Sequence, residues 1–111
     1  MKVLVSPRVR SYLYELSEIL HDKEYFGFLE TAEKYVEELF KDIETSLPYK
    51  LKHIAPQYFE RYGKKLFYAT FVKNKHTTWY VFFSTYQNVD NELIYLVTYI
   101  SNNHVIGHLL D

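Results

Sequence analysis

Three apolar segments near the C-terminal half decide the fold: residues 65–73 read KLFYATFVK, residues 77–86 read TTWYVFFSTY, and residues 92–100 read ELIYLVTYI. Aromatic and β-branched residues dominate all three segments, a composition typical of strands packed on a half-buried sheet. The linkers between them, residues 74–76 and 87–91, are short and polar. Short polar linkers favour hairpins, so residues 65–101 are predicted to form a three-stranded antiparallel meander.

The segments before this meander predict one strand and two helices. Residues 2–6 (KVLVS) are β-branched and apolar, and Ser6-Pro7 is a typical helix start because serine caps free amides and proline suits the first helical position. Apolar residues then recur at helical spacing over residues 7–21 and 28–47, and Pro48 ends the second run. We therefore predict an α+β fold: an N-terminal strand, an antiparallel helical hairpin on one sheet face, and the meander completing a four-stranded twisted sheet.

Composition places limits on the class of protein. The 111 residues, 48% hydrophobic and 24% charged, suit one domain over residues 1–111. No apolar run reaches the roughly 20 residues that span a membrane, and the N-terminus lacks the features of a signal peptide. We therefore expect a cytoplasmic protein that has no membrane contact. The chain has no cysteine, and its formal charge of -1 argues against a strongly basic nucleic-acid-binding protein.

Residues 48–65 (PYKLKHIAPQYFERYGKK) are the least regular and the most basic segment of the chain. The order of strand, helical hairpin, basic segment and meander resembles the RelE/ParE superfamily of type II toxins. Short strings that also resemble it are VLVSPRVR at residues 3–10, Ala32 with Ile43 and Leu47, LKH at residues 51–53, and LFY at residues 66–68. The resemblance covers essentially the whole chain.

This resemblance implies a toxin that a cognate antitoxin neutralises, and whose target is either ribosome-bound mRNA or DNA gyrase. In the first case the protein would be a metal-independent endoribonuclease, with His104 in proton transfer and Arg61 and Lys65 on phosphate. Further RNA-binding residues would be Lys50, Lys52, His53 and Lys64. The chain departs from the expected pattern, because Lys65 replaces an arginine and no arginine lies near the C-terminus.

A non-catalytic interaction domain, either dimeric or bound to a partner, is the alternative that the near-neutral charge leaves open. Alternation in the last strand predicts that Ile94, Leu96 and Ile100 face the helices. The set of Tyr95, Val97 and Tyr99 would then lie on the opposite face, against the tail of the chain, a second copy or an antitoxin. These three residues are therefore the predicted partner-binding set.

Metal and cofactor sites have little support in the sequence. His104 and His108 have the i, i+4 spacing of two zinc ligands on one helix face, but no third ligand follows them. With three glycines in the whole chain, there is no glycine-rich phosphate-binding loop. We therefore expect neither a metal nor a cofactor.

Overall fold

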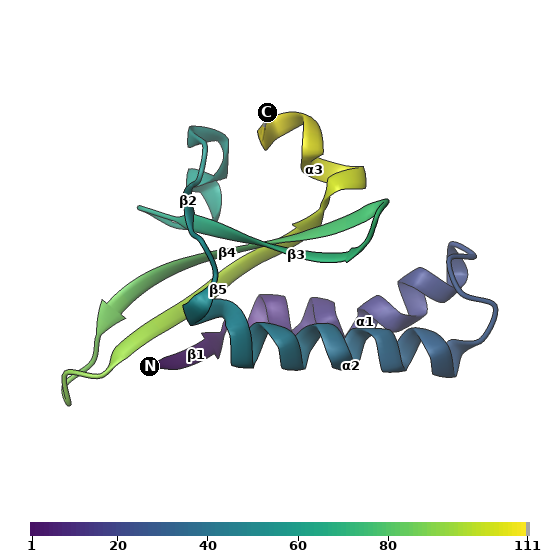
Figure 1. Ribbon diagram of the computed structural model, residues 1–111, viewed down its shortest axis with the longest axis horizontal. Helices are drawn as coiled ribbons and strands as arrows, with labels where there is room; N and C mark the ends of the chain where they lie inside the picture. Colours follow the sequence, from purple (N-terminus) through teal and green to yellow (C-terminus); the bar gives the residue numbers. More distant parts are fainter. Residues whose placement is uncertain (111) are drawn as a thin grey trace.

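A five-stranded sheet lies between two layers of helix in the computed structural model, which describes residues 1–110 (Figure 1). The strands are β1 (Lys2–Val5), β2 (His53–Ile54), β3 (Phe67–Asn74), β4 (Thr77–Gln87) and β5 (Leu93–Asn102). The α-helices are α1 (Pro7–Asp22), α2 (Leu29–Ser46) and α3 (Asn103–Leu110), and two 3-10 helices are η1 (Leu47–Tyr49) and η2 (Gln57–Tyr62). The predicted α+β class is confirmed.

The sheet has the strand order β1-β5-β4-β3-β2. The predicted meander is present, since β3 pairs antiparallel with β4 and β4 antiparallel with β5. The first strand pairs with β5 in parallel, which makes the sheet mixed. The predicted count of four strands is wrong, because His53 and Ile54 of the basic segment pair antiparallel with β3 and add a short fifth strand.

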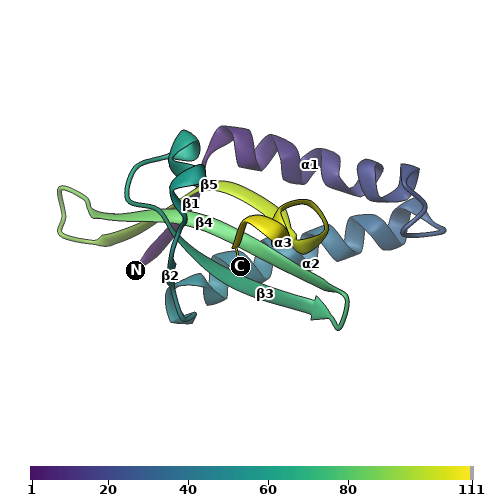
Figure 2. The same ribbon diagram turned by 90° about the horizontal axis from the view of Figure 1, so that it is seen from above.

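The helical hairpin covers one face of this sheet, as the apolar stripes predict. Ser6 caps α1 by accepting a hydrogen bond from the Val9 amide at 3.3 Å, and Pro7 occupies the first turn. Figure 2 shows α1 on the β5 side of the sheet and α2 on the β3 side. Both helices bury their apolar residues against alternate residues of the strands, among them Trp79, Val81 and Phe83.

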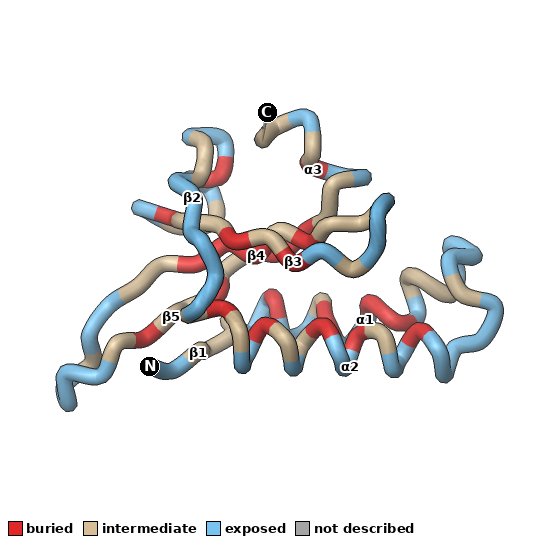
Figure 3. The backbone as a smooth tube through the Cα atoms, viewed as in Figure 1, coloured by how far each residue is buried: buried red, intermediate tan, exposed pale blue. Residues whose placement is uncertain are grey.

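The second face of the sheet is covered by the chain itself. Figure 3 shows η2 and α3 on the side of the sheet opposite the hairpin, with buried strand segments between the two layers. Phe59 of η2 is fully buried and stacks on Phe82 with 4.4 Å between ring centroids, while Ile106 of α3 joins the same cluster. The tail after β5 forms an eight-residue helix, because its apolar residues have this second face to bury against.

A β-bulge in β5 changes which residues face the helices. Phe82 pairs with Tyr99 and Phe83 with Val97, so Thr98 has no opposite residue in β4. The prediction that Tyr95, Val97 and Tyr99 share the face opposite the helices is therefore wrong. Tyr95 and Val97 pack in the helix-side core, where Val97 is fully buried, and Tyr99 lies on the opposite face. A strict alternation of two residues cannot anticipate an inserted residue.

Substitution of Phe59 tests whether η2 is a structural cover of the second face. Phe59→Ala should lower the free energy of unfolding by about 3–5 kcal/mol, because it removes a buried ring and leaves a cavity above Phe82. Tyr58→Ala is the matched control, since the neighbouring Tyr58 side chain is 42% exposed. Urea unfolding followed by circular dichroism measures both variants, and equal stabilities would contradict this role of η2.

Candidate functional site

The β3–β4 turn and the start of α3 are joined by side-chain hydrogen bonds of Asn103. Its Oδ1 accepts from the Thr78 amide at 2.9 Å, and its Nδ2 donates to the His76 carbonyl oxygen at 3.0 Å. Asn102 is the last residue of β5, and its side chain caps the start of α3. Its Oδ1 accepts a hydrogen bond from the His104 amide at 2.9 Å. Segments that lie about 25 residues apart in the sequence are therefore joined into one corner of the fold.

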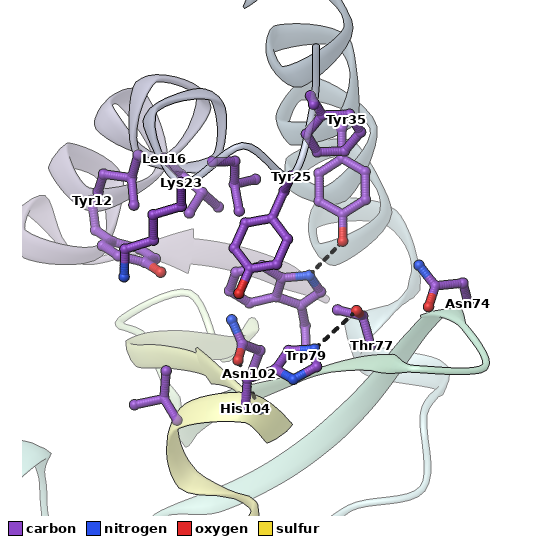
Figure 4. Close-up of a pocket in the computed structure, with 14 residues that line it drawn as sticks. Tyr12, Leu16, Lys23, Tyr25, Tyr35, Asn74, Thr77, Trp79, Asn102 and His104 are labelled. Atoms are coloured by element: carbon purple, nitrogen blue, oxygen red, sulfur yellow. Dashed lines mark hydrogen bonds between the residues drawn. The ribbon is translucent and has the colours of Figure 1, made fainter.

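His104 lies at this corner and is oriented by a threonine. Its Nε2 shares a hydrogen bond of 3.2 Å with the Thr77 hydroxyl (Figure 4). The other ring nitrogen, Nδ1, makes no hydrogen bond to any residue within 1–110. An imidazole that is held through one nitrogen and free at the other has the arrangement of a general base or acid.

His104 opens onto a pocket of about 270 Å³ between α1, the α1–α2 turn and the sheet. Its back wall is Trp79, which is 1% exposed and whose indole Nε1 donates to the Tyr35 hydroxyl at 2.8 Å. Figure 4 shows the polar and aromatic side chains around this wall. We define the His104 pocket by its lining residues: Tyr12, Leu16, Ile19, Leu20, Lys23, Tyr25, Phe26, Tyr35, Asn74, Thr77, Trp79, Asn102, His104 and Val105.

The His104 pocket combines cationic and neutral polar groups with aromatic rings. Lys23 is cationic, and among the described residues no aspartate or glutamate lines the pocket. Burial raises the pKa of Tyr12, with a smaller contribution from Tyr99, and burial also raises the pKa of Tyr35 against the opposing hydrogen bond from Trp79. Both phenols are therefore neutral donors at physiological pH. Such a site suits a ligand that has a planar ring and a negative charge.

The predicted basic residues lie elsewhere, along β3 and on η2. The Nζ atoms of Lys50 and Lys52 lie over the rings of Phe71 and Phe67 at 4.5 and 4.4 Å from the centroids. His53 stacks on another ring of β3, that of Tyr68, at 5.0 Å between centroids. These contacts hold the stems of the two lysines and the ring of His53 against β3.

Arg61 and Lys65 do not join His104. The Arg61 guanidinium lies 4.0 Å from the Tyr58 ring centroid and donates from Nε to the Tyr58 carbonyl oxygen, so it folds back on its own helix. Lys64 and Lys65 are exposed in the turn before β3, whereas Thr77 lies beyond the other end of that strand. Eight strand residues span roughly 23 Å, so the structure separates Lys65 from the His104 corner.

Of the residues predicted to be catalytic, His104 alone lies in this pocket, and the structure adds others that the sequence did not indicate. These are Lys23, Tyr25, Tyr35, Asn74, Thr77, Trp79 and Asn102. They come from the α1–α2 turn, α2, the β3–β4 hairpin and the end of β5. A weak signal was present, since asparagine and threonine concentrate at residues 74–78 and 101–104. It does not reveal which side chains meet across the fold.

No protein-family model, no curated protein and no solved structure matches the chain. Within residues 1–110, no helix is both long enough and apolar enough to cross a membrane. The same residues contain no cluster of three histidine, cysteine or acidic side chains that could hold a metal ion.

Tyr35→Phe tests the hydrogen bond at the back of the pocket. It removes the acceptor of a buried indole N–H, so the variant should lose about 1–3 kcal/mol of stability. The emission of Trp79, the single tryptophan, should change in the native state as well. Tyr14→Phe is the control, since Tyr14 is 71% exposed. Unchanged emission and stability in Tyr35→Phe would show that the bond does not order the pocket.

The raised tyrosine pKa values predict instability at high pH. Burial raises the pKa of Tyr12, Tyr35 and Tyr99 in the folded state above the ordinary value of 10.0. Their stabilising effect is complete below the unfolded pKa and disappears as the pH rises through the folded pKa. Urea unfolding from about pH 9 to about pH 11 should show falling stability. Tyr12→Phe should reduce the slope, and a slope equal to that of the unsubstituted chain would contradict the assignment.

Proposed function

We propose that this chain is a RelE/ParE-like toxin that arrests growth by cleaving RNA at the His104 pocket, and that a cognate antitoxin neutralises it. The observation that carries the proposal is the placement of His104. Its ring is fixed by Thr77 at the mouth of an aromatic pocket whose charged lining residue is Lys23. The order of strand, helical hairpin, basic segment and meander supports the same proposal at the level of architecture.

The chemistry needed is a transfer of phosphorus from one oxygen to another. His104, through Nδ1, removes the proton from a ribose 2′-hydroxyl, whose oxygen attacks the adjacent phosphorus. The bond from phosphorus to the 5′-oxygen of the next nucleotide breaks, which leaves a 2′,3′-cyclic phosphate and a 5′-hydroxyl. The phenol of Tyr25 is placed in the same pocket to protonate that leaving oxygen, and Lys23 stabilises the charge on the phosphate. No metal is required for these steps.

We propose that the antitoxin binds at the β2 edge of the sheet. Tyr49, Leu51 and Ile54 lie in and just before the edge strand β2, and each is at least 77% exposed. Large apolar side chains along an open strand edge are a typical site for a partner protein.

This same edge favours a second candidate function, a non-catalytic domain that acts by binding DNA gyrase or another protein partner. Arg61 and Lys65 lie away from His104, which agrees with a non-catalytic binding function. It predicts that toxicity depends on the exposed residues of the β2 edge and is independent of the His104 imidazole.

Expression of His104→Gln in cells without an antitoxin separates the two candidates. Removal of a general base typically lowers a rate by 10²–10⁴-fold, so this variant should permit growth while the unsubstituted chain arrests it. His108→Gln, a change at an exposed position four residues further along α3, should still arrest growth. RNA from arrested cells should carry new 5′-hydroxyl ends. Arrest by His104→Gln with intact RNA would exclude the ribonuclease and favour the binding function.

A further inference from the structure

We propose that the RNA strand continues from the His104 pocket into a second subsite between α1 and β5, where Arg8 binds a phosphate. We define the α1–β5 groove as the hollow lined by Arg8, Val9, Tyr12, Thr98, Tyr99, Ile100, Ser101 and Val105, with a volume of about 320 Å³. This inference rests on the proposed function, since it extends the binding site for the same substrate.

The groove exists because β1 ends early. The parallel pairing of β1 with β5 stops at Val97, whose carbonyl oxygen accepts a hydrogen bond from the Ser6 amide at 2.9 Å. The chain then turns into α1, so Thr98 to Asn102 have no strand partner on that side within residues 1–110. Figure 2 shows α1 running beside β5. Arg8, Val9 and Tyr12 of α1 line the other wall of the groove.

The groove adjoins the His104 pocket. Tyr12 and Val105 line both hollows, so a bound strand can pass from one into the other along α1. Arg8 lines the groove at the end of this path away from His104, and Lys23 lines the His104 pocket at the other end. Lys23, the C-cap of α1, lies fifteen positions after Arg8, and at the helical rise this is about 22 Å, a distance that suits a single strand of about four nucleotides.

Charge distinguishes this path from the other hollows of the molecule. Within residues 1–110, neither the groove nor the His104 pocket is lined by an acid, although the chain has 14 acidic residues. The hollow on the outer surface of the hairpin is lined by Glu37 and Glu44 together with Arg10 and Lys41, so its charges balance. The hollow at the α1–α2 turn is acidic, with Asp22 and Glu24. A polyanion is therefore repelled at the α1–α2 turn, and along the groove and the pocket it meets Arg8 and Lys23 with no opposing acid.

The lining chemistry also suits nucleotides. Tyr12 presents a ring on which a base can stack, and its burial-raised pKa keeps the phenol uncharged beside phosphate. Thr98 also lines the groove, and its buried hydroxyl oxygen has no hydrogen-bond partner among the described residues. The guanidinium of Arg8 lies 6.0 Å from the centroid of the Tyr62 ring, which orients it at the end of the groove.

Binding of a fluorescein-labelled hexadeoxynucleotide tests the subsite, because DNA lacks the 2′-hydroxyl and is not cleaved. Arg8→Gln should weaken binding about 5–10-fold and reduce the salt dependence by the contribution of about one phosphate. Arg10→Gln removes the same charge from the same helix, but Arg10 lies over Phe40 on the outer surface of the hairpin. The Arg10→Gln variant should therefore bind the oligonucleotide as tightly as the unsubstituted chain does. Fluorescence anisotropy at several salt concentrations measures all three proteins.

Equal affinities of Arg8→Gln and Arg10→Gln, or no binding by the unsubstituted chain, would overturn the proposal. Tighter binding of a hexaglutamate peptide with the same dependence on Arg8 would also overturn it, in favour of an acidic protein partner. The test is separate from growth arrest. If His104→Gln still arrests growth while Arg8→Gln loses oligonucleotide binding, the ribonuclease proposal fails and the subsite stands. If cleavage depends on His104 but oligonucleotide binding is unchanged in Arg8→Gln, the subsite proposal fails and the ribonuclease proposal stands.

Discussion

The central strand β4 is apolar on both of its faces, and the rest of the structure depends on covering both. Phe82 and Phe83 are consecutive, point to opposite sides of the sheet, and are each no more than 1% exposed. Burial of one such side chain contributes roughly 1.5–3 kcal/mol, so leaving either face open would remove much of the stability of a small domain. The helical hairpin covers Phe83, and η2 with α3 covers Phe82.

This second cover also determines where chemistry can occur. Because α3 must return over the sheet immediately after β5, its first residues lie beside the β3–β4 turn, where Asn103 bonds to both Thr78 and His76. The His104 ring is thereby held at the edge of the core with its neighbouring pocket on the hairpin side. The eight residues of α3 thus cover the second face of the sheet and also orient the His104 side chain.

Local patterns in the sequence were enough to predict the first strand, the two long helices and the meander in their correct order, but they did not predict β2, η2 or α3. The period-two strands, the Ser6-Pro7 helix start and the two helical stripes all depend on neighbouring residues, and the structure contains each of them. Features set by distant contacts were not predictable in this way. The bulge at Thr98 arises in the pairing of β4 with β5, and it moved Tyr95 and Val97 to the helix side.

The candidate site shows the same division between local and distant information. His104 was predicted because the resemblance implies catalytic groups near the C-terminus and histidine is a common acid or base. Lys23 and Tyr35 reach its pocket from elements at least 69 positions earlier in the chain. The concentration of lysines in residues 48–65 suggested a phosphate site there. In the structure, Lys50 and Lys52 lie over phenylalanine rings of β3, and Arg61 bonds to its own helix.

The central claim is that the functional surface lies at the His104 pocket and along α1, and that the basic segment has a structural role. Nuclear magnetic resonance titration with a short oligodeoxynucleotide tests this most directly, because it reports on every residue at once. The account predicts that chemical shifts change at the Trp79 indole N–H, Thr77, His104 and Tyr12. Changes confined to residues 50–65, with the Trp79 indole signal unmoved, would contradict it.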